Sequence, residues 1–286
     1  MILRRAAILF LLLPAAVRAA PRSRAAASAT GPSAAPVLST SSFSWRAETN
    51  TTFAAGESLL FEINYGFITG GWATLEVRST ETVHGRDAWR IVSQVRSSKK
   101  VDVFYKVRDL SETWMDVGSL CTHQFHKIMN EGSYHREAES RFDQTGGTFV
   151  YWNRGKGGQS TVQGKVPPFV QDILTSLYYV RSRPLTPGRD ISVDVNSGGK
   201  TWSLRVEVLG KEKVKVPAGT FPCVHVRPLL AGEGLFMQTG KLEVWLTDDA
   251  RRMPVLLRSK VWVGSFSAEL LEYDAHRTVP RDLLTR

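Results

Sequence analysis

The sequence predicts an all-β protein, mainly antiparallel, that forms a large curved meander sheet or a half-open barrel with one short helix packed on it. Three observations support this fold class. Apolar and polar residues alternate along most of the chain, as they do in half-buried strands. The links between these runs, such as H-G-R-D, N-E-G, T-G-G and S-G-G, are short and rich in turn-forming residues. A single segment follows helical periodicity instead.

The clearest strands are residues 59–65 and 201–208. In the first, Leu59, Phe61, Ile63 and Tyr65 share one face, and in the second Trp202 and Leu204 share a face with two valines. The short glycine-rich links between the predicted strands favour antiparallel pairing of neighbouring strands. Similar runs lie near residues 72–80, 88–97, 101–108, 121–129, 134–142, 147–152, 189–195, 221–227, 234–247, 253–263 and 265–273.

The helix is predicted within P-P-F-V-Q-D-I-L-T-S-L-Y-Y-V-R-S-R-P, where the apolar residues recur at i, i+3, i+4, i+7 and i+8. Asp172 lies in the first turn and Arg181 in the last, as the helix dipole favours, and Pro184 ends the segment. Near the C-terminus, Trp245 and Trp262 face opposite to their apolar neighbours, so that part of the sheet is apolar on both faces. We expect the helix to cover one face and the curl of the sheet to enclose the other.

The N-terminal segment resembles an export signal. Residues 1–19 combine a positive start, an apolar stretch and a small-residue cleavage pattern, whereas residues 20–44 are rich in Ala, Ser and Pro and predict a disordered tail. Residues 45–276 then form a single β-rich domain, followed by a C-terminal tail at 277–286. No cysteine follows the cleavage pattern to carry a lipid. A periplasmic or secreted protein of the cell envelope, soluble after removal of the signal peptide, is predicted.

The formal net charge of +10 is spread among acidic residues, and its densest cluster, R-S-S-K-K at 96–100, fits a solvated turn. We therefore expect no nucleic-acid partner, while peripheral contact with a membrane stays open.

Several motifs resemble chemical sites, but none has the required context. Asp248 and Asp249 lie between two strand-like runs, and adjacent aspartates in a turn splay apart, whereas glycosidase carboxyl groups face each other at about 5–9 Å. His123 and His126 are three apart on a predicted strand and point to opposite faces, so they do not share a metal. The segment N-S-G-G-K-T at 196–201 precedes a strand rather than the helix of a phosphate-binding loop.

Two cysteines are present, Cys121 and Cys223. In an exported protein they form a disulfide or remain buried as small apolar side chains, and the sequence leaves both alternatives open. No G-x-S-x-G motif supplies a serine nucleophile.

Four segments together resemble a known bacterial family. These are V-Q-D-I-L-T-S-L-Y-Y-V-R, G-K-E-K-V-K-V-P-A-G-T-F-P-C-V-H-V, V-W-L-T-D-D-A-R-R-M-P-V and G-S-F-S-A-E-L, and they resemble the envelope family called domain of unknown function 3108 over roughly residues 55–275. The tryptophan strand, acidic turn and proline strand are also similar to a hairpin of periplasmic lipoprotein-carrier and lipoprotein-sorting proteins. That similarity implies a curved sheet that holds acyl chains under helices.

These observations predict a non-enzymatic envelope protein that binds an apolar ligand, such as a lipid or acyl chain, without cofactor or metal. The expected ligand contacts are large apolar residues that alternation places on apolar strand faces, although alternation does not decide which face is concave: Phe61, Ile63, Tyr65, Trp89, Trp202 and Leu204. Two alternatives remain: a scaffold that binds another envelope protein, and an uncharacterised hydrolase.

Overall fold

The structure is a computed structural model that describes residues 43–231, 242–260 and 265–273. The described residues form one 14-stranded antiparallel sheet in the order β8-β7-β6-β5-β4-β3-β2-β1-β14-β13-β12-β11-β10-β9. The strands are β1 Ser58–Tyr65, β2 Ile68–Val83, β3 Arg86–Ser97, β4 Arg108–Asp116, β5 Thr122–Glu131, β6 Tyr134–Asp143, β7 Thr148–Gly155, β8 Gly158–Lys165, β9 Ile191–Ser197, β10 Lys200–Val216, β11 Gly219–Ala231, β12 Leu242–Thr247, β13 Pro254–Lys260 and β14 Ser265–Tyr273.

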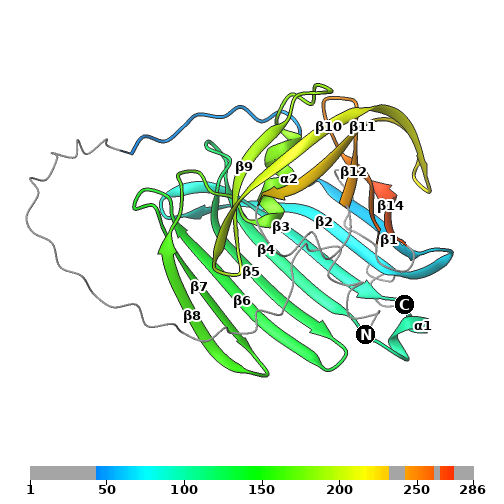
Figure 1. The fold of residues 1–286 in the computed structure, drawn as a ribbon, viewed down its shortest axis with the longest axis horizontal. Helices are drawn as coiled ribbons and strands as arrows, with labels where there is room; N and C mark the ends of the chain where they lie inside the picture. Colours follow the sequence, from blue (N-terminus) through cyan, green and yellow to red (C-terminus); the bar gives the residue numbers. More distant parts are fainter. Residues whose placement is uncertain (1–42, 232–241, 261–264, 274–286) are drawn as a thin grey trace, which may run out of the picture.

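The sheet is a half-open barrel, as predicted. Pairing of β1 with β14 joins the two halves of the meander, while β8 and β9 are the two edges and do not pair with each other. The chain crosses from one edge to the other through α2, Ile173–Arg181. In Figure 1, α2 lies within the curve of the sheet, and the green strands β5–β8 form a broad wing beside it.

The predicted helix is confirmed. Asp172 is its N-cap rather than a residue of its first turn, and a capping box links Asp172 with Thr175. The apolar side of α2 packs into the main core, where Leu174 and Tyr178 lie among side chains from the concave side of the sheet. The helix contacts β9 and β4. It therefore fills one half of the barrel and leaves the wing β5–β8 with a smaller core of its own.

Two strand assignments from the sequence were wrong. The predicted strand at 101–108 begins with the last two residues of α1, Lys99–Asp102, which Ser98 caps. An exposed link with Val103 and Phe104 follows α1. The true strand, β4, begins where the predicted one ends. Strand β8 was missed because G-Q-S-T-V-Q-G-K is polar on both faces, which fits an exposed edge strand.

The described chain begins with a segment packed on the domain. Phe43, which the sequence analysis places in the tail, contacts the rings of Trp45 and Phe169 at centroid distances of 5.1 and 5.4 Å. Residue 43 thus packs on the domain, and the predicted domain bounds of 45–276 stay a prediction. The predicted signal peptide, the tail to residue 42, residues 234–241 and Trp262 lie outside the described residues. Among the described helices, none has the length and apolar character needed to cross a bilayer.

Candidate functional site

A cavity of about 610 Å³ lies on the concave side of the wing, between strands β5–β8 and the tip of the β9–β10 hairpin. Its volume is in the range of small-molecule sites. Three rows of paired residues cross the four strands and form its floor. The rows are Phe125–Ser140–Tyr151–Val162, Lys127–Ala138–Asn153–Ser160 and Met129–Arg136–Gly155–Gly158.

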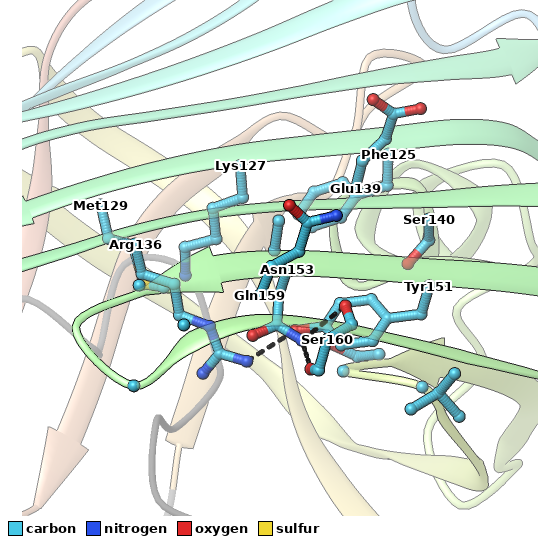
Figure 2. Close-up of a pocket in the computed structure, with 18 of the residues that line it drawn as sticks. Phe125, Lys127, Met129, Arg136, Glu139, Ser140, Tyr151, Asn153, Gln159 and Ser160 are labelled. Atoms are coloured by element: carbon cyan, nitrogen blue, oxygen red, sulfur yellow. Dashed lines mark hydrogen bonds between the residues drawn. The ribbon is translucent and has the colours of Figure 1, made fainter.

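The floor is apolar at one end and cationic at the other. Phe125, Tyr151 and Val162 occupy the first row, whereas Lys127 and Arg136 bring positive charge in the second and third. Figure 2 shows Arg136 reaching across the cavity to Tyr151, with Lys127 on the neighbouring strand. The glycines opposite Arg136 leave the space beside its guanidinium open. An amphipathic molecule with an acidic group would match this division.

Arg136 is held in its charged form by phenol groups rather than by a carboxylate. Its Nη2 donates to Tyr151 Oη at 2.7 Å. Burial lowers the pKa of Arg136, but Tyr134 and Tyr151 outweigh burial and raise it above the ordinary value. Its Nε is buried without a hydrogen-bond partner, and no carboxylate of the described chain forms an ion pair with it. The guanidinium therefore has donor capacity left for an acidic ligand.

Lys127 lies beside a buried pair of carboxyl groups, Asp109 and Glu131. Burial lowers the pKa of Lys127, an effect that both acids oppose. Burial and the neighbouring Asp109 raise the pKa of Glu131 to about 7, and Tyr105 Oη donates to Glu131 Oε2 at 3.3 Å. Burial raises the pKa of Asp109 as well. Like charges this close do not both ionise readily, so the pair holds a proton until the pH rises through about 7. While Glu131 is protonated, Lys127 offsets the charge of Asp109, and Arg136 contributes a further positive charge to the cavity.

The β9–β10 hairpin forms the remaining wall. The segment N-S-G-G-K-T, which resembles the end of a phosphate-binding loop, is the turn of this hairpin, and a strand follows it as predicted. Gly199 has φ +77°, and a Cβ there would lie 3.2 Å from the Tyr151 ring and 3.4 Å from Val162. Only glycine allows this close approach, which brings the hairpin against strands at the other edge of the sheet.

The six predicted ligand contacts are elsewhere in the barrel. Phe61 and Leu204 are buried in the main core, and Ile63 and Trp89 pack against it. Tyr65 lies against Phe266 at a centroid distance of 4.7 Å, and Trp202 is half-buried on β10. None of the six lines the 610 Å³ cavity. Their role as ligand contacts stays a prediction, and this cavity is a separate candidate.

The cavity residues were missed because two cations interrupt the apolar face of their strands. In F-H-K-I-M-N-E, alternation places Phe125, Lys127, Met129 and Glu131 on one face. Because two of these four residues are charged, the sequence indicates that this face is exposed. In the structure that face is the concave one. A signal was present in the long apolar residues that flank Lys127, since they are typical of a buried face.

The histidines separate as predicted. His123 Nε2 lies 2.9 Å from Asp116, whereas His126 Nε2 lies 3.1 Å from Glu137. His123 is buried and lies at a bulge in the β4–β5 ladder. Burial raises the pKa of Asp116, but Arg86, His123 and the Ser119 amide lower it well below the ordinary value. Among the described residues no group of three or more His, Cys, Asp or Glu side chains could hold a metal.

Cys121 and Cys223 are both buried and do not form a disulfide with each other. The structure thus shows the second alternative, two buried thiols. Cys121 lies just before β5 and Cys223 on β11, and seven strands separate β5 from β11 in the sheet order. Burial raises the pKa of both thiols to about 12. A nucleophilic thiolate is therefore disfavoured at either position.

Asp248 and Asp249 occupy the β12–β13 turn, as predicted. Asp249 Oδ1 accepts from Thr247 Oγ1 at 2.7 Å and from the amides of Arg251 and Arg252. Asp248 pairs with Lys211 at 2.7 Å rather than with the flanking arginines. The side chain of Arg252 donates instead to the carbonyl of Arg181 in α2 at 2.9 Å. This turn is a structural element that anchors the helix.

A solved structure shares this architecture. A β-barrel-like protein of domain of unknown function DUF1849 from Brucella abortus matches with a TM-score of 0.53 at 9% identity, covering 76% of this chain and 96% of its own. At this identity, the similarity to the Brucella abortus protein concerns the fold alone. A Bacteroides fragilis protein with a YmcC-like fold matches at 10% identity and a TM-score of 0.37, covering 81% of this chain and 100% of its own. The latter score is too low to carry an argument.

No curated protein matches the chain. The family model described as "Protein of unknown function (DUF3108)" matches residues 60–271, which is most of the β-rich domain and contains every strand that lines the cavity. The chain therefore belongs to the DUF3108 family, as its sequence motifs predict.

Proposed function

We propose that this protein is an exported, non-enzymatic protein of the cell envelope that binds an acidic amphiphile, such as a fatty acid or acyl phosphate, in the concave cavity. The observation that carries the proposal is the open 610 Å³ cavity with an apolar row at one end and Arg136 at the other. The charge of Arg136, lacking a carboxylate partner, would receive the acidic group. Phe125 and Val162 would contact the chain.

The test is titration with fluorescent fatty acids of increasing length and with uncharged monoacylglycerols of the same lengths. We expect saturable one-to-one binding that strengthens by up to about 0.8 kcal/mol for each additional methylene that is buried. The acid should bind more tightly than the uncharged lipid. A folded protein that binds neither series at any length would reject the proposal.

The charge contribution is tested with Arg136→Met. Loss of one charge-assisted hydrogen bond should weaken acid binding by about 1.5–3 kcal/mol and leave the uncharged lipid little affected. Arg154→Met is the matched control, because Arg154 lies on the same sheet but pairs with Glu137 at an exposed position. Equal losses in the two variants would mean that overall charge, rather than the cavity, attracts the acid.

A scaffold that binds another envelope protein is the second candidate. It is supported by β8, a polar and exposed edge strand whose outer edge has no strand paired to it among the described residues. Edges of this kind accept a strand from a partner. Native mass spectrometry of protein purified from its own envelope would distinguish the candidates, since a carrier retains lipid mass and a scaffold retains a second chain.

A further inference from the structure

Four large apolar residues are more than 60% exposed at one end of the barrel. Phe67 and Ile68 lie at the β1–β2 turn, and Val103 and Phe104 lie after α1, with exposed fractions of 109, 62, 77 and 82%. We call these four residues the apolar rim. The other exposed large apolar residues of the described chain have exposed fractions of 36–45%. Exposure this great, repeated on adjacent loops, is unusual for a surface that contacts only water.

The two loops of the apolar rim are neighbours. The amide of Ser98, the N-cap of α1, donates to Gly70 O at 2.8 Å, and its hydroxyl donates to Thr69 O at 3.3 Å. These bonds hold the α1 link against the start of β2. The four apolar side chains therefore belong to one surface rather than to two unrelated loops.

The same end of the barrel carries one end of the cavity. Gly132, in the β5–β6 turn, donates to Lys106 O at 2.7 Å and so joins that turn to the α1 link. Tyr134, which follows the turn, and the glycines of the β7–β8 turn line the cavity. In Figure 1, α1 and the green turns of β5–β6 and β7–β8 lie along the lower edge of the molecule.

The charge around this end is positive. Exposed lysines surround the loops, and none of them forms an ion pair with a described residue. They are Lys99, Lys100, Lys106 and Lys156. The nearest acid on the α1 link, Asp102, is already paired with Arg108. The opposite end differs, because the segment from residue 43 covers its loops through bonds such as Glu48 N to Gly118 O at 2.7 Å.

We propose that the apolar rim docks the protein on the surface of a bilayer rich in anionic phospholipid. The four side chains enter the interfacial region while the lysines contact the phosphate groups, as in other interfacial anchors. Docking in this orientation places the end of the cavity near Tyr134 and the β7–β8 turn toward the membrane. The proposal concerns a surface outside the cavity and does not depend on cavity binding.

The experiment is flotation of the purified protein with vesicles of phosphatidylcholine alone or of an equimolar mixture with phosphatidylglycerol. We expect binding to the mixed vesicles, little binding to the uncharged ones and a decrease with added salt. The double variant Phe67→Ser, Phe104→Ser should lose about tenfold or more in partition coefficient. Lys99→Gln with Lys100→Gln should lose roughly tenfold on the mixed vesicles.

The matched control is Val150→Ser with Leu209→Ser, which removes two exposed apolar side chains from strands away from this end. This control should float like the unchanged protein, and circular dichroism should be the same for all variants. Absence of binding to anionic vesicles would overturn the proposal. So would unchanged binding by the Phe67→Ser, Phe104→Ser variant, or a dimer in solution that this variant dissociates, since the rim would then be an interface between two copies.

Discussion

Arg181 in α2 donates to both carboxylate oxygens of Glu57, through Nη1 to Oε1 and Nη2 to Oε2, each at 2.7 Å. Both side chains are buried, with exposed fractions of 0 and 5%. Arg181 also donates to the carbonyls of Arg251 and Arg252 in the β12–β13 turn. One side chain thus joins the helix to the residue that precedes β1 and to a turn near the end of the domain.

Removal of this guanidinium should destabilise the fold strongly. Arg181→Met leaves the Glu57 carboxylate buried without its partner, and we expect the free energy of unfolding to fall by about 3–5 kcal/mol in chemical denaturation. Arg183→Met is the control, because Arg183 pairs with Glu48 at a partly exposed site and should cost less than about 1 kcal/mol. Equal decreases in the free energy of unfolding for the two variants would argue against the buried Arg181–Glu57 pair as the main link between α2 and the start of β1.

The two aspartates of the β12–β13 turn should contribute unequally. Asp249→Ala removes an acceptor shared by one hydroxyl and two amides and should cost about 1–2 kcal/mol. Asp248→Ala removes a half-exposed ion pair with Lys211 and should cost less than about 1 kcal/mol. Thermal and denaturant unfolding measure both. A folded double variant that loses ligand or membrane binding would contradict the structural role of the turn.

The stability of the protein should depend on Glu131 between mildly acidic and neutral pH. Its pKa of about 7 in the folded state exceeds the ordinary value of 4.5, so the folded state binds the proton more tightly than the unfolded state does. The stabilisation is complete below the ordinary pKa and is lost as the pH rises through 7. The free energy of unfolding should therefore decrease from pH 5 to pH 8.

Glu131→Gln keeps a neutral side chain of similar size and should remove most of this decrease. The groups that face Glu131 are Asp109, Lys127 and Tyr105, and they remain in the variant. Denaturant unfolding at several pH values is the measurement. If the unchanged protein and Glu131→Gln show the same pH dependence, the proton resides elsewhere.

Much of the fold could be predicted from the sequence because local patterns determine it. The 3.6-residue spacing of apolar residues places α2, and alternation with glycine-rich turns places most of the strands. The edge strand β8 could not be predicted in this way, since an exposed strand needs no apolar face. The strand assignment at 101–108 was wrong for the opposite reason, because Val103 and Phe104 in this segment are exposed at the apolar rim.

The candidate cavity was not predictable from the sequence. It depends on contact between the edges of a sheet whose strands lie far apart in the chain, as when Gly199 meets Tyr151 and Val162. It also depends on which face of β5 and β6 is concave, and alternation alone does not decide this. Arg181 illustrates the same limit: its position suggests interaction with the helix dipole, yet its partner is Glu57, 124 positions earlier.

The cavity itself can be tested by narrowing it at the edge strand. Ser160 is exposed on β8 and faces the cavity, where its Oγ accepts from Asn153 Nδ2 at 2.6 Å. Ser160→Trp adds a large side chain without overpacking a core, so stability should change by less than about 1 kcal/mol. If the acyl chain lies over the floor of β5–β8, this ring should occupy part of its space and weaken fatty-acid binding by about tenfold.

Thr161→Trp provides the matched control for Ser160→Trp. Thr161 is the next residue on the same strand and is also exposed, but it points to the other face and does not line the cavity. Both variants add the same ring to the same edge, so a general effect on β8 would appear in both. Fatty-acid titration should therefore separate them. Equal affinities for Ser160→Trp and Thr161→Trp would place the ligand outside this cavity, and the predicted contacts Phe61, Trp89 and Leu204 would become the next positions to test.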